Sequence, residues 1–300
     1  MKIHPDGCLI ILRRSNILII DLNQVMISTF MAQVGNHTNI DIDEDLMRHM
    51  ILNSIRANIK KFRPQYGNNV IIACDDRHYW RRSVFPYYKA NRRKAREASD
   101  LNWPAIFEVL GKIKAELREF FPYRVIQCEG AEADDVIGTL VQRFGNTSEK
   151  ILVLSGDKDF VQLHVYMNVK QYDPVRKKYI INNDPESFIR EHIMRGDSGD
   201  GIPNFLSPDN CLVVGERQAA IRQNKLNIWL TQEPAQFCDQ MMLRNYKRNQ
   251  ELIDLSMTPE NIKSAINSEF DAQSNKPRSH LFNYFIDKKL KNLIDAIGDF

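Results

Sequence analysis

The sequence predicts an α/β fold with a mostly parallel central sheet flanked by helices, followed by a smaller helical C-terminal part. In the first half, short apolar runs alternate with stretches whose apolar residues recur three or four positions apart. This alternation implies helical crossovers between parallel strands. Beyond about residue 184, helical patterns dominate. We therefore expect an α/β domain at residues 1–184 and a helical domain at 185–300, although no Pro/Gly/Ser-rich linker separates them.

The individual elements follow from the same pattern. Apolar runs predict strands at residues 17–20, 70–74, 124–127 and 151–154, and the last strands at 169–172 and 179–181. Helical spacing predicts helices at 47–62, 103–121 and 133–144. In the last segment, 280–300, the core is the favoured place for the apolar residues Leu281, Phe285, Leu290, Leu293 and Ile297, and a partner-docking helix is the alternative.

Composition excludes several classes of protein. A chain of 300 residues that is 43% hydrophobic and 26% charged has ordinary globular values, so global disorder is excluded. The widely spaced cysteines Cys8, Cys74, Cys128, Cys211 and Cys238 form no C-x-x-C pair, which favours a reducing cytoplasm without disulfides or a thiolate zinc site. No apolar stretch reaches the ~18 residues of a membrane span, and the run at 8–12 is too short for a signal-peptide core.

Carboxylates follow three of the expected strands. Asp21 follows the first strand, Asp75 the second, and Asp157 and Asp159 come shortly after the strand at 151–154. Because parallel strands end at the same edge of a sheet, where α/β proteins bind ligands, these side chains are expected to share one pocket. A single Asp after a strand is more often a turn former or a helix cap, so only their joint occurrence favours a site.

Two further acidic groups extend this pattern. Glu132 and Asp134 stand at the start of the helix at 133–144, and Asp197 and Asp200 lie in the glycine-rich G-D-S-G-D-G-I-P segment. Clustered carboxylates repel one another, and hard divalent cations with oxygen ligands relieve that repulsion. Two such ions about 4 Å apart can activate water and stabilise a leaving oxygen in phosphoryl transfer. We therefore expect two Mg²⁺ ions, with Mn²⁺ able to substitute, and no role for a histidine or cysteine nucleophile.

A basic segment at residues 78–100, which we call the basic arch, follows Asp75. Between residues 79 and 96 it has seven cationic and five aromatic residues and no acidic one, and Pro86 breaks its helical pattern. Cations attract phosphate and aromatic rings stack on unpaired bases, so the arch predicts nucleic-acid binding, whereas a solvated basic helix face is the alternative. The expected contacts are Arg81, Arg82, Tyr88, Lys89, Arg92, Arg93 and Lys94.

In combination these motifs resemble the 5′ nuclease, or flap endonuclease, family, and in particular its T-even-type phage ribonucleases H. The matching pieces are I-I-D-L-N-Q, A-C-D-D, Y-W-R-R, F-P-Y-Y-K-A-N-R, E-A-D-D, L-S-G-D-K-D-F and R-G-D-S-G-D-G-I-P, together with N-Y-F-I-D-K-K-L-K-N-L-I-D-A-I near the C-terminus. Their order and spacing agree over residues 15–205. The resemblance implies a PIN-like core and a two-metal hydrolase that leaves 5′-phosphate products.

The resemblance also implies roles for particular residues. Around the first metal it places Asp21, Asp75, Glu132, Asp134 and Asp157, and around the second Asp159, Asp197 and Asp200. Lys89 and Arg92 match positions at the scissile phosphate, with Tyr88 beside them. The implied activity is 5′-to-3′ exonuclease and flap endonuclease action that removes RNA primers and adjacent DNA. The implied partners are RNA–DNA hybrids, flap or nicked DNA, a single-strand-binding protein and a sliding clamp. The protein is expected to be a monomer in the bacterial host cytoplasm.

One departure from the family and three rival functions remain open. The helix–hairpin–helix glycines that bind duplex backbone are largely missing after Asp200, and the resemblance does not extend to a K⁺ site. The expected duplex contacts are Gly215, Arg217 and nearby basic residues such as Arg222 and Lys225. A non-cutting binding module would lack several of these acids. A phosphoaspartate phosphatase would show a D-x-D pair, whereas Asp21 is followed by Leu22 and Asn23. A PIN-type ribonuclease would lack the long arch and the helical second part.

Overall fold

The computed structural model describes residues 16–34, 43–273 and 276–300. Its centre is a six-stranded sheet in the order β3-β2-β1-β4-β5-β6. The neighbouring strands are parallel except for the antiparallel pair of β5 and β6. The predicted mostly parallel sheet is therefore confirmed. The strands are β1 (Ile17–Asp21), β2 (Asn69–Ala73), β3 (Arg124–Ile126), β4 (Ile151–Leu154), β5 (Val169–Asp173) and β6 (Lys178–Ile180).

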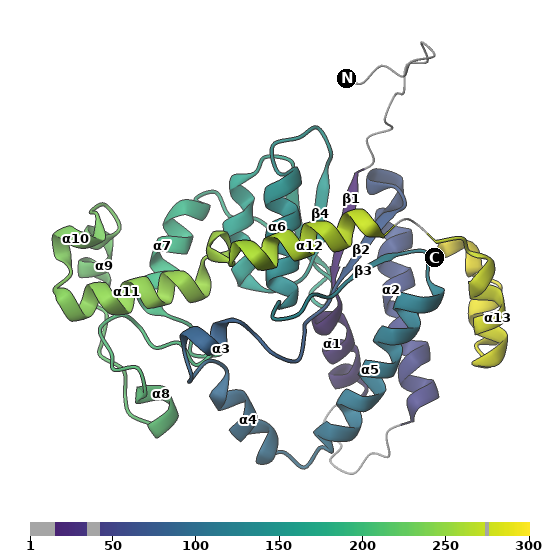
Figure 1. The fold of residues 1–300 in the computed structure, drawn as a ribbon, viewed down its shortest axis with the longest axis horizontal. Helices are drawn as coiled ribbons and strands as arrows, with labels where there is room; N and C mark the ends of the chain where they lie inside the picture. The colour runs from purple at the N-terminus through teal and green to yellow at the C-terminus, as the bar shows by residue number, and fades with distance from the viewer. Residues whose placement is uncertain (1–15, 35–42, 274–275) are drawn as a thin grey trace.

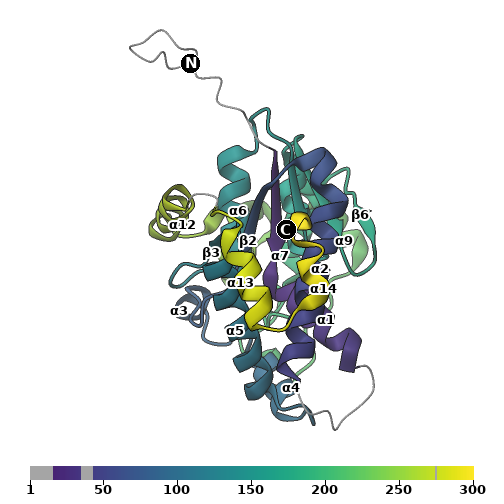
Figure 2. The ribbon, with the colours of Figure 1, turned by 90° about the vertical axis from the view of Figure 1, so that its right-hand side faces the viewer.

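Helices cover both faces of the sheet because successive strand residues point to opposite sides. Leu18 and Ile20 pack into one apolar layer, and Ile17 and Ile19 pack into the other. The first layer holds α1 (Leu22–Val34), α2 (Glu44–Tyr66), α5 (Trp103–Phe120), α13 (Ser279–Asp287) and α14 (Lys291–Ile294). The second layer holds α6 (Ala133–Phe144), the 3₁₀ helices η1 (Lys158–Val165) and η2 (Leu255–Met257), and α12 (Glu260–Ala272). Figures 1 and 2 show α13 and α14 on the side of α2 and α5, away from α12.

A third apolar cluster joins the helical part to the basic arch. It combines Phe85 and Tyr88 with residues of the helices that follow β6. These helices are α7 (Pro185–Arg195), α9 (Gln223–Trp229), α10 (Pro234–Phe237) and α11 (Gln240–Ile253), and the short helix α8 (Cys211–Val214) lies between α7 and α9 in the sequence. The arch itself contains α3 (Arg81–Val84) and α4 (Ala90–Glu97), separated at Pro86 as the sequence predicts. Figure 1 shows α4 below the sheet, between α8 and α5.

The C-terminal segment belongs to the core of the α/β part. Leu281, Phe285, Leu290 and Leu293 are buried in the first layer, and Ile297, in the 3₁₀ helix η3 (Ile297–Asp299), packs against it. The predicted core placement of these residues is therefore confirmed. Residue 184 lies between β6 and α7, but the chain crosses back to the sheet after α11, so the division at 184 stays a prediction.

Among the described residues, Cys74, Cys128, Cys211 and Cys238 are free thiols. Cys8 and the apolar run at 8–12 lie outside the described residues. Within the parts of the chain that the structure describes, no helix is both long enough and apolar enough to cross a membrane.

Candidate active site

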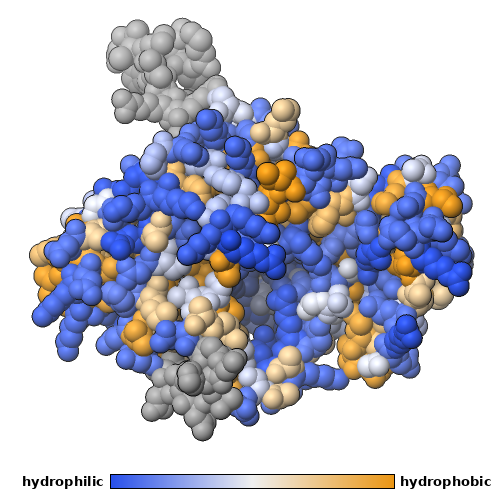
Figure 3. Space-filling view, turned by 180° about the vertical axis from the view of Figure 1, so that it is seen from behind, coloured by the Kyte–Doolittle hydropathy of each residue, from blue (hydrophilic) through white to orange (hydrophobic). Residues whose placement is uncertain are grey.

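Four of the predicted carboxylates meet at the carboxyl edge of the sheet. Asp21 is the last residue of β1, Asp75 follows β2, Asp134 lies in the first turn of α6, and Asp157 follows β4. All four line one cavity of about 510 Å³. Figure 3, seen from behind, shows a hollow near the centre of the molecule that is bordered largely by hydrophilic residues. The parallel direction of β1, β2 and β4 is what brings these distant residues to one place.

Local hydrogen bonds fix the first two carboxylates. Asp21 accepts from the backbone N of Gln24 at 3.1 Å and from Ser155 Oγ at 2.9 Å. Asp75 accepts from the backbone N of Ala133 at 2.7 Å and from Asn23 Nδ2. Because Ala133 opens α6, this contact ties the start of that helix to the end of β2. The carboxylates are therefore held in place by neighbouring elements.

The electrostatics of this group favour a bound cation. Burial raises the pKa of Asp21 to about 7, with Asp75 and Asp157 adding to the rise. Loss of solvation, followed by the charge of Asp157, raises the pKa of Asp134 well above its ordinary value. Burial and neighbouring carboxylates thus make Asp21 and Asp134 harder to ionise, and a divalent cation among them would reverse that effect.

The second predicted group divides into two parts. Asp159 and Asp197 lie beside His192 of α7, whose Nε2 is 3.3 Å from Asp159 Oδ1 and 3.5 Å from Asp197 Oδ2. Lys158 Nζ lies 2.8 Å from Asp197 Oδ2. Burial opposes ionisation of Asp197, but the adjacent His192 and Lys158 outweigh it and hold the pKa of Asp197 well below its usual range. No local motif in the sequence marks His192, so nothing in the sequence indicates its place here.

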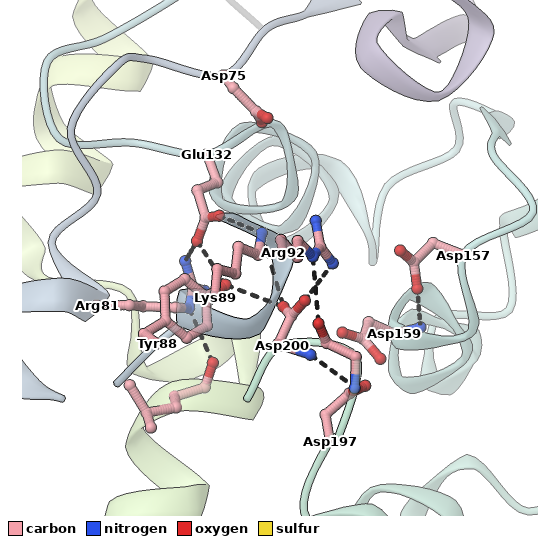
Figure 4. Close-up of polar contacts among 12 residues, drawn as sticks. Asp75, Arg81, Tyr88, Lys89, Arg92, Glu132, Asp157, Asp159, Asp197 and Asp200 are labelled. Atoms are coloured by element: carbon pink, nitrogen blue, oxygen red, sulfur yellow. Dashed lines mark hydrogen bonds and ion pairs between the residues drawn. The ribbon is translucent and has the colours of Figure 1, made fainter. Parts of the chain in front are cut away.

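Asp200 instead faces the basic arch. Arg92 Nη2 bonds to Asp200 Oδ1, Tyr88 OH donates to Asp200 Oδ2 at 3.1 Å, and Lys89 Nζ lies 3.6 Å from the same oxygen. Figure 4 shows Asp200 beside Arg92 and Lys89. The carboxylate of Glu132 is similarly engaged, since it accepts from Tyr88 OH at 2.8 Å and Lys89 Nζ at 2.5 Å. In this structure both acids neutralise cations of the arch.

The structure contradicts the predicted role of Arg81. It was expected to contact nucleic acid, but only 2% of its surface is exposed. Its guanidinium donates to both carboxylate oxygens of Asp135 and to Glu132 Oε2, each at 2.9 Å, and its Nε donates to Leu252 O at 2.8 Å. A buried guanidinium with these partners cannot reach a phosphate without breaking the core. Arg81 therefore holds the arch to α6 and α11.

The other predicted basic residues are distributed along the surface. Lys89 and Arg92 line the acidic cavity, as does Arg96. Arg82, Arg93 and Arg217 are exposed, and Lys94 Nζ donates to Val213 O at 2.9 Å, which links α4 to α8. Two aromatic residues of α5 that were not among the predicted site residues, Trp103 and Phe107, also line the cavity. Their position at the start of the helix that follows the arch is the sequence feature that could have placed them at the site.

The raised pKa values of the buried acids give a test in the metal-free protein. Burial raises the pKa of both Asp21 and Asp159 to about 7, so the folded state binds protons more tightly than the unfolded state. The stability that these protons contribute is complete below about pH 4 and is lost as the pH rises through about 7. We expect Tm in chelator to fall between about pH 5.5 and 8, and Mg²⁺ to raise Tm more at pH 8 than at pH 5.5. A Tm that rises over this range, or equal Mg²⁺ effects at both values, would contradict the assignment.

Two families of known proteins match successive parts of the chain. Residues 16–192 match the 5′-3′ exonuclease, N-terminal resolvase-like domain, and residues 183–300 match the T4 RNase H, C terminal, domain. The chain belongs to the 5′-3′ exonuclease family. It is 33% identical over 296 residues to Ribonuclease H of Enterobacteria phage T4, which covers 96% of both chains.

Two further likenesses agree with this assignment. Flap endonuclease Xni of Shewanella sp. (strain ANA-3) is 28% identical over 170 residues, which is 54% of this chain and 59% of that protein. The T5 D15 protein co-crystallised with metal ions shares the fold with a TM-score of 0.59 at 16% identity, covering 86% of this chain and 100% of that chain. The family and the fold predicted from the sequence are thus confirmed.

Proposed function

We propose that this protein is a Mg²⁺-dependent 5′-to-3′ exonuclease and flap endonuclease. It would cleave the RNA strand of RNA–DNA hybrids and adjacent DNA, leave 5′-phosphates, and remove RNA primers during phage DNA replication in the bacterial cytoplasm. The observation that carries the proposal is one cavity lined both by the carboxylates Asp21, Asp75, Asp134 and Asp157 and by the cations Lys89 and Arg92. Its relationship to a phage Ribonuclease H supports the RNA–DNA hybrid as substrate.

The residues present fit divalent cations. Asp21, Asp75, Asp134 and Asp157 offer carboxylates in one cavity, and burial raises the pKa of Asp21, Asp75 and Asp134, as expected for buried groups that share a cation. Asp159 Oδ1 is buried and has no hydrogen-bond partner among the described residues. Hard cations such as Mg²⁺ take oxygen ligands of this kind, and Mn²⁺ would fit as well. When bound, two such ions would activate a water molecule and neutralise charge on the phosphate.

We assign the other catalytic tasks to the arch. Lys89 has a left-handed backbone with φ of 56°, and its backbone N donates to Asp200 O at 2.7 Å. This anchor aims the ammonium of Lys89 into the cavity, where Glu132 and Asp200 hold it charged and its pKa raised despite burial. An incoming phosphate would replace these acids as the partner of Lys89 and Arg92, and so place the scissile bond beside the carboxylates. Glu132 and Asp200 would thus orient the cations before substrate binds, a modified role for two predicted metal ligands.

The exposed cations would bind the substrate on either side of this point. Arg82 and Arg93 on the arch and Arg217 beyond α8 are exposed and can meet phosphates of the single strand and the duplex. As replication partners we further propose a single-strand-binding protein and a sliding clamp, and we propose that the enzyme is a monomer.

The proposal is tested with matched labelled substrates. We expect release of short 5′-labelled products from an RNA–DNA hybrid and from a 5′ flap when Mg²⁺ is present, and no release in chelator. A flap whose 5′ end is blocked by a bulky group serves as the control for entry from that end. Hydrolysis of a small phosphomonoester, with the nucleic acids left intact, would favour a phosphatase instead.

Lys89→Ala is expected to slow cleavage far more than it weakens binding. The ammonium would oppose negative charge that develops on the phosphate, so we expect the single-turnover rate to fall by about 10²–10³-fold. Binding in Ca²⁺ should weaken only a few-fold, as the other arch cations remain. The comparison is Arg93→Ala, which removes an exposed arch cation outside the cavity; we expect it to weaken binding slightly and to leave the single-turnover rate unchanged. A large loss of affinity at an unchanged single-turnover rate would make Lys89 a phosphate anchor instead.

A further inference from the structure

His192 occupies a position that the mechanism above leaves unexplained. It lies on α7, five residues before Asp197, and only 7% of its surface is exposed. Its ring stacks on Phe188, with centroids 5.8 Å apart and planes at 9°. The stacking fixes the ring, and Nε2 is left facing Asp159 and Asp197.

The facing atoms are not satisfied by hydrogen bonds. Neither His192 Nε2 nor Asp159 Oδ1 has a partner with hydrogen-bond geometry among the described residues, although both atoms are buried. Buried polar atoms without partners are costly, so each such atom calls for an explanation. Two of them point at the same space, next to the carboxylate of Asp197.

The spacing of these atoms suits an ion between them. Nε2 is 3.3 Å from Asp159 Oδ1 and 3.5 Å from Asp197 Oδ2, and one ligand atom from each of the three residues lies within 4.8 Å of the others. Two ligands at right angles, each about 2.1–2.2 Å from an ion, lie about 3 Å apart. Small shifts would therefore bring all three atoms to ligand distance.

We propose that His192 is a direct nitrogen ligand of the second metal, together with Asp159 and Asp197, and that it shifts this site's preference from Mg²⁺ toward Mn²⁺ and related ions. The proposal rests on the proposed two-metal function and adds to it a ligand of a different chemical class. Imidazole suits first-row transition metals, whereas Mg²⁺ takes mainly oxygen ligands. The first site, with carboxylates only, would keep its preference for hard ions.

Lys158 completes the site in the metal-free state. Its ammonium lies 2.8 Å from Asp197 Oδ2, and 54% of its side chain is exposed. A long, half-exposed side chain can move into solvent when an ion takes its place, and this frees the Asp197 oxygen as a ligand. The buried His192 ring, in contrast, has no such freedom and would stay.

The decisive experiment detects the nitrogen directly. The full-length protein is loaded with Mn²⁺ and examined by electron spin echo envelope modulation, which shows ¹⁴N coupling when an imidazole is bound to the ion. We expect this coupling in the wild type and in His164→Gln, and its loss in His192→Phe, which keeps an aromatic ring against Phe188. His164 is the matched control, because it lies on η1, its Nε2 donates to Gln171 Oε1 at 3.1 Å, and it does not line the cavity.

Calorimetric titrations provide the second measurement. We expect His192→Phe to lower the Mn²⁺-over-Mg²⁺ preference of one of two sites by about tenfold or more. Mn²⁺ binding without ¹⁴N coupling in the wild type would overturn the proposal and leave the two-metal function intact. Absence of Mn²⁺ binding would instead refute the two-metal function itself. The wild-type spectrum by itself shows whether an imidazole binds the ion. The test therefore does not depend on whether His192→Phe folds properly.

Discussion

Asp134→Asn is expected to abolish most cleavage and at the same time to stabilise the metal-free protein. The carboxylate lines the cavity beside Asp157 and Asp21, and loss of solvation, together with these neighbouring charges, raises its pKa well above the ordinary value. Removing the charge relieves that repulsion but also removes a ligand. We expect the single-turnover rate in Mg²⁺ to fall by about 10³-fold or more, since the loss of one preorganised group already costs about 10²–10³-fold. Tm in chelator should rise above that of the wild type.

The control for this variant is Asp76→Asn. Asp76 follows Asp75 directly, but its carboxylate accepts from the backbone N of Gly130 and from Gln127 Nε2, at 3.1 and 3.2 Å. It does not line the cavity. The control should keep its cleavage rate and lose about 1 kcal/mol of stability. Cleavage by Asp134→Asn within tenfold of the wild type would remove Asp134 from the metal site.

Arg81→Ala is expected to have the largest effect on stability, whereas Arg82→Ala should have almost none. Arg81 is buried against Asp135 and Glu132, which are 0% and 1% exposed. Without the guanidinium Asp135 would lie buried without a cationic partner, although Glu132 would keep Lys89. Breaking a buried pair in this way costs about 3–5 kcal/mol. Arg82 is exposed, and surface substitutions usually change stability by less than about 0.5 kcal/mol.

Urea unfolding monitored by circular dichroism would measure both variants. A destabilisation of less than about 1 kcal/mol in Arg81→Ala would contradict the buried network. Binding to a flap in Ca²⁺ at low temperature gives a separate reading. If Arg81→Ala remained folded and lost affinity more than Arg82→Ala, the original expectation of a phosphate contact would return.

The sequence by itself determined the sheet, its helical crossovers and the edge where the carboxylates gather. Short apolar runs predicted strands because they bury both faces, and helical spacing between them required parallel connections. Since parallel strands all end at one edge, Asp21, Asp75 and Asp157 had to meet there. These conclusions depend on local pattern and on chain direction, which a sequence contains.

Only the tertiary structure decided which charged residues face the cavity and which serve the core. Arg81 and Arg82 are adjacent in an equally basic segment, yet one is buried and the other exposed. The partners that bury Arg81 lie 54 positions away at Asp135 and 171 positions away at Leu252. His192 likewise meets Asp159 only because α7 packs against η1. Burial and pairing arise from contacts between distant segments, so no local pattern could show them.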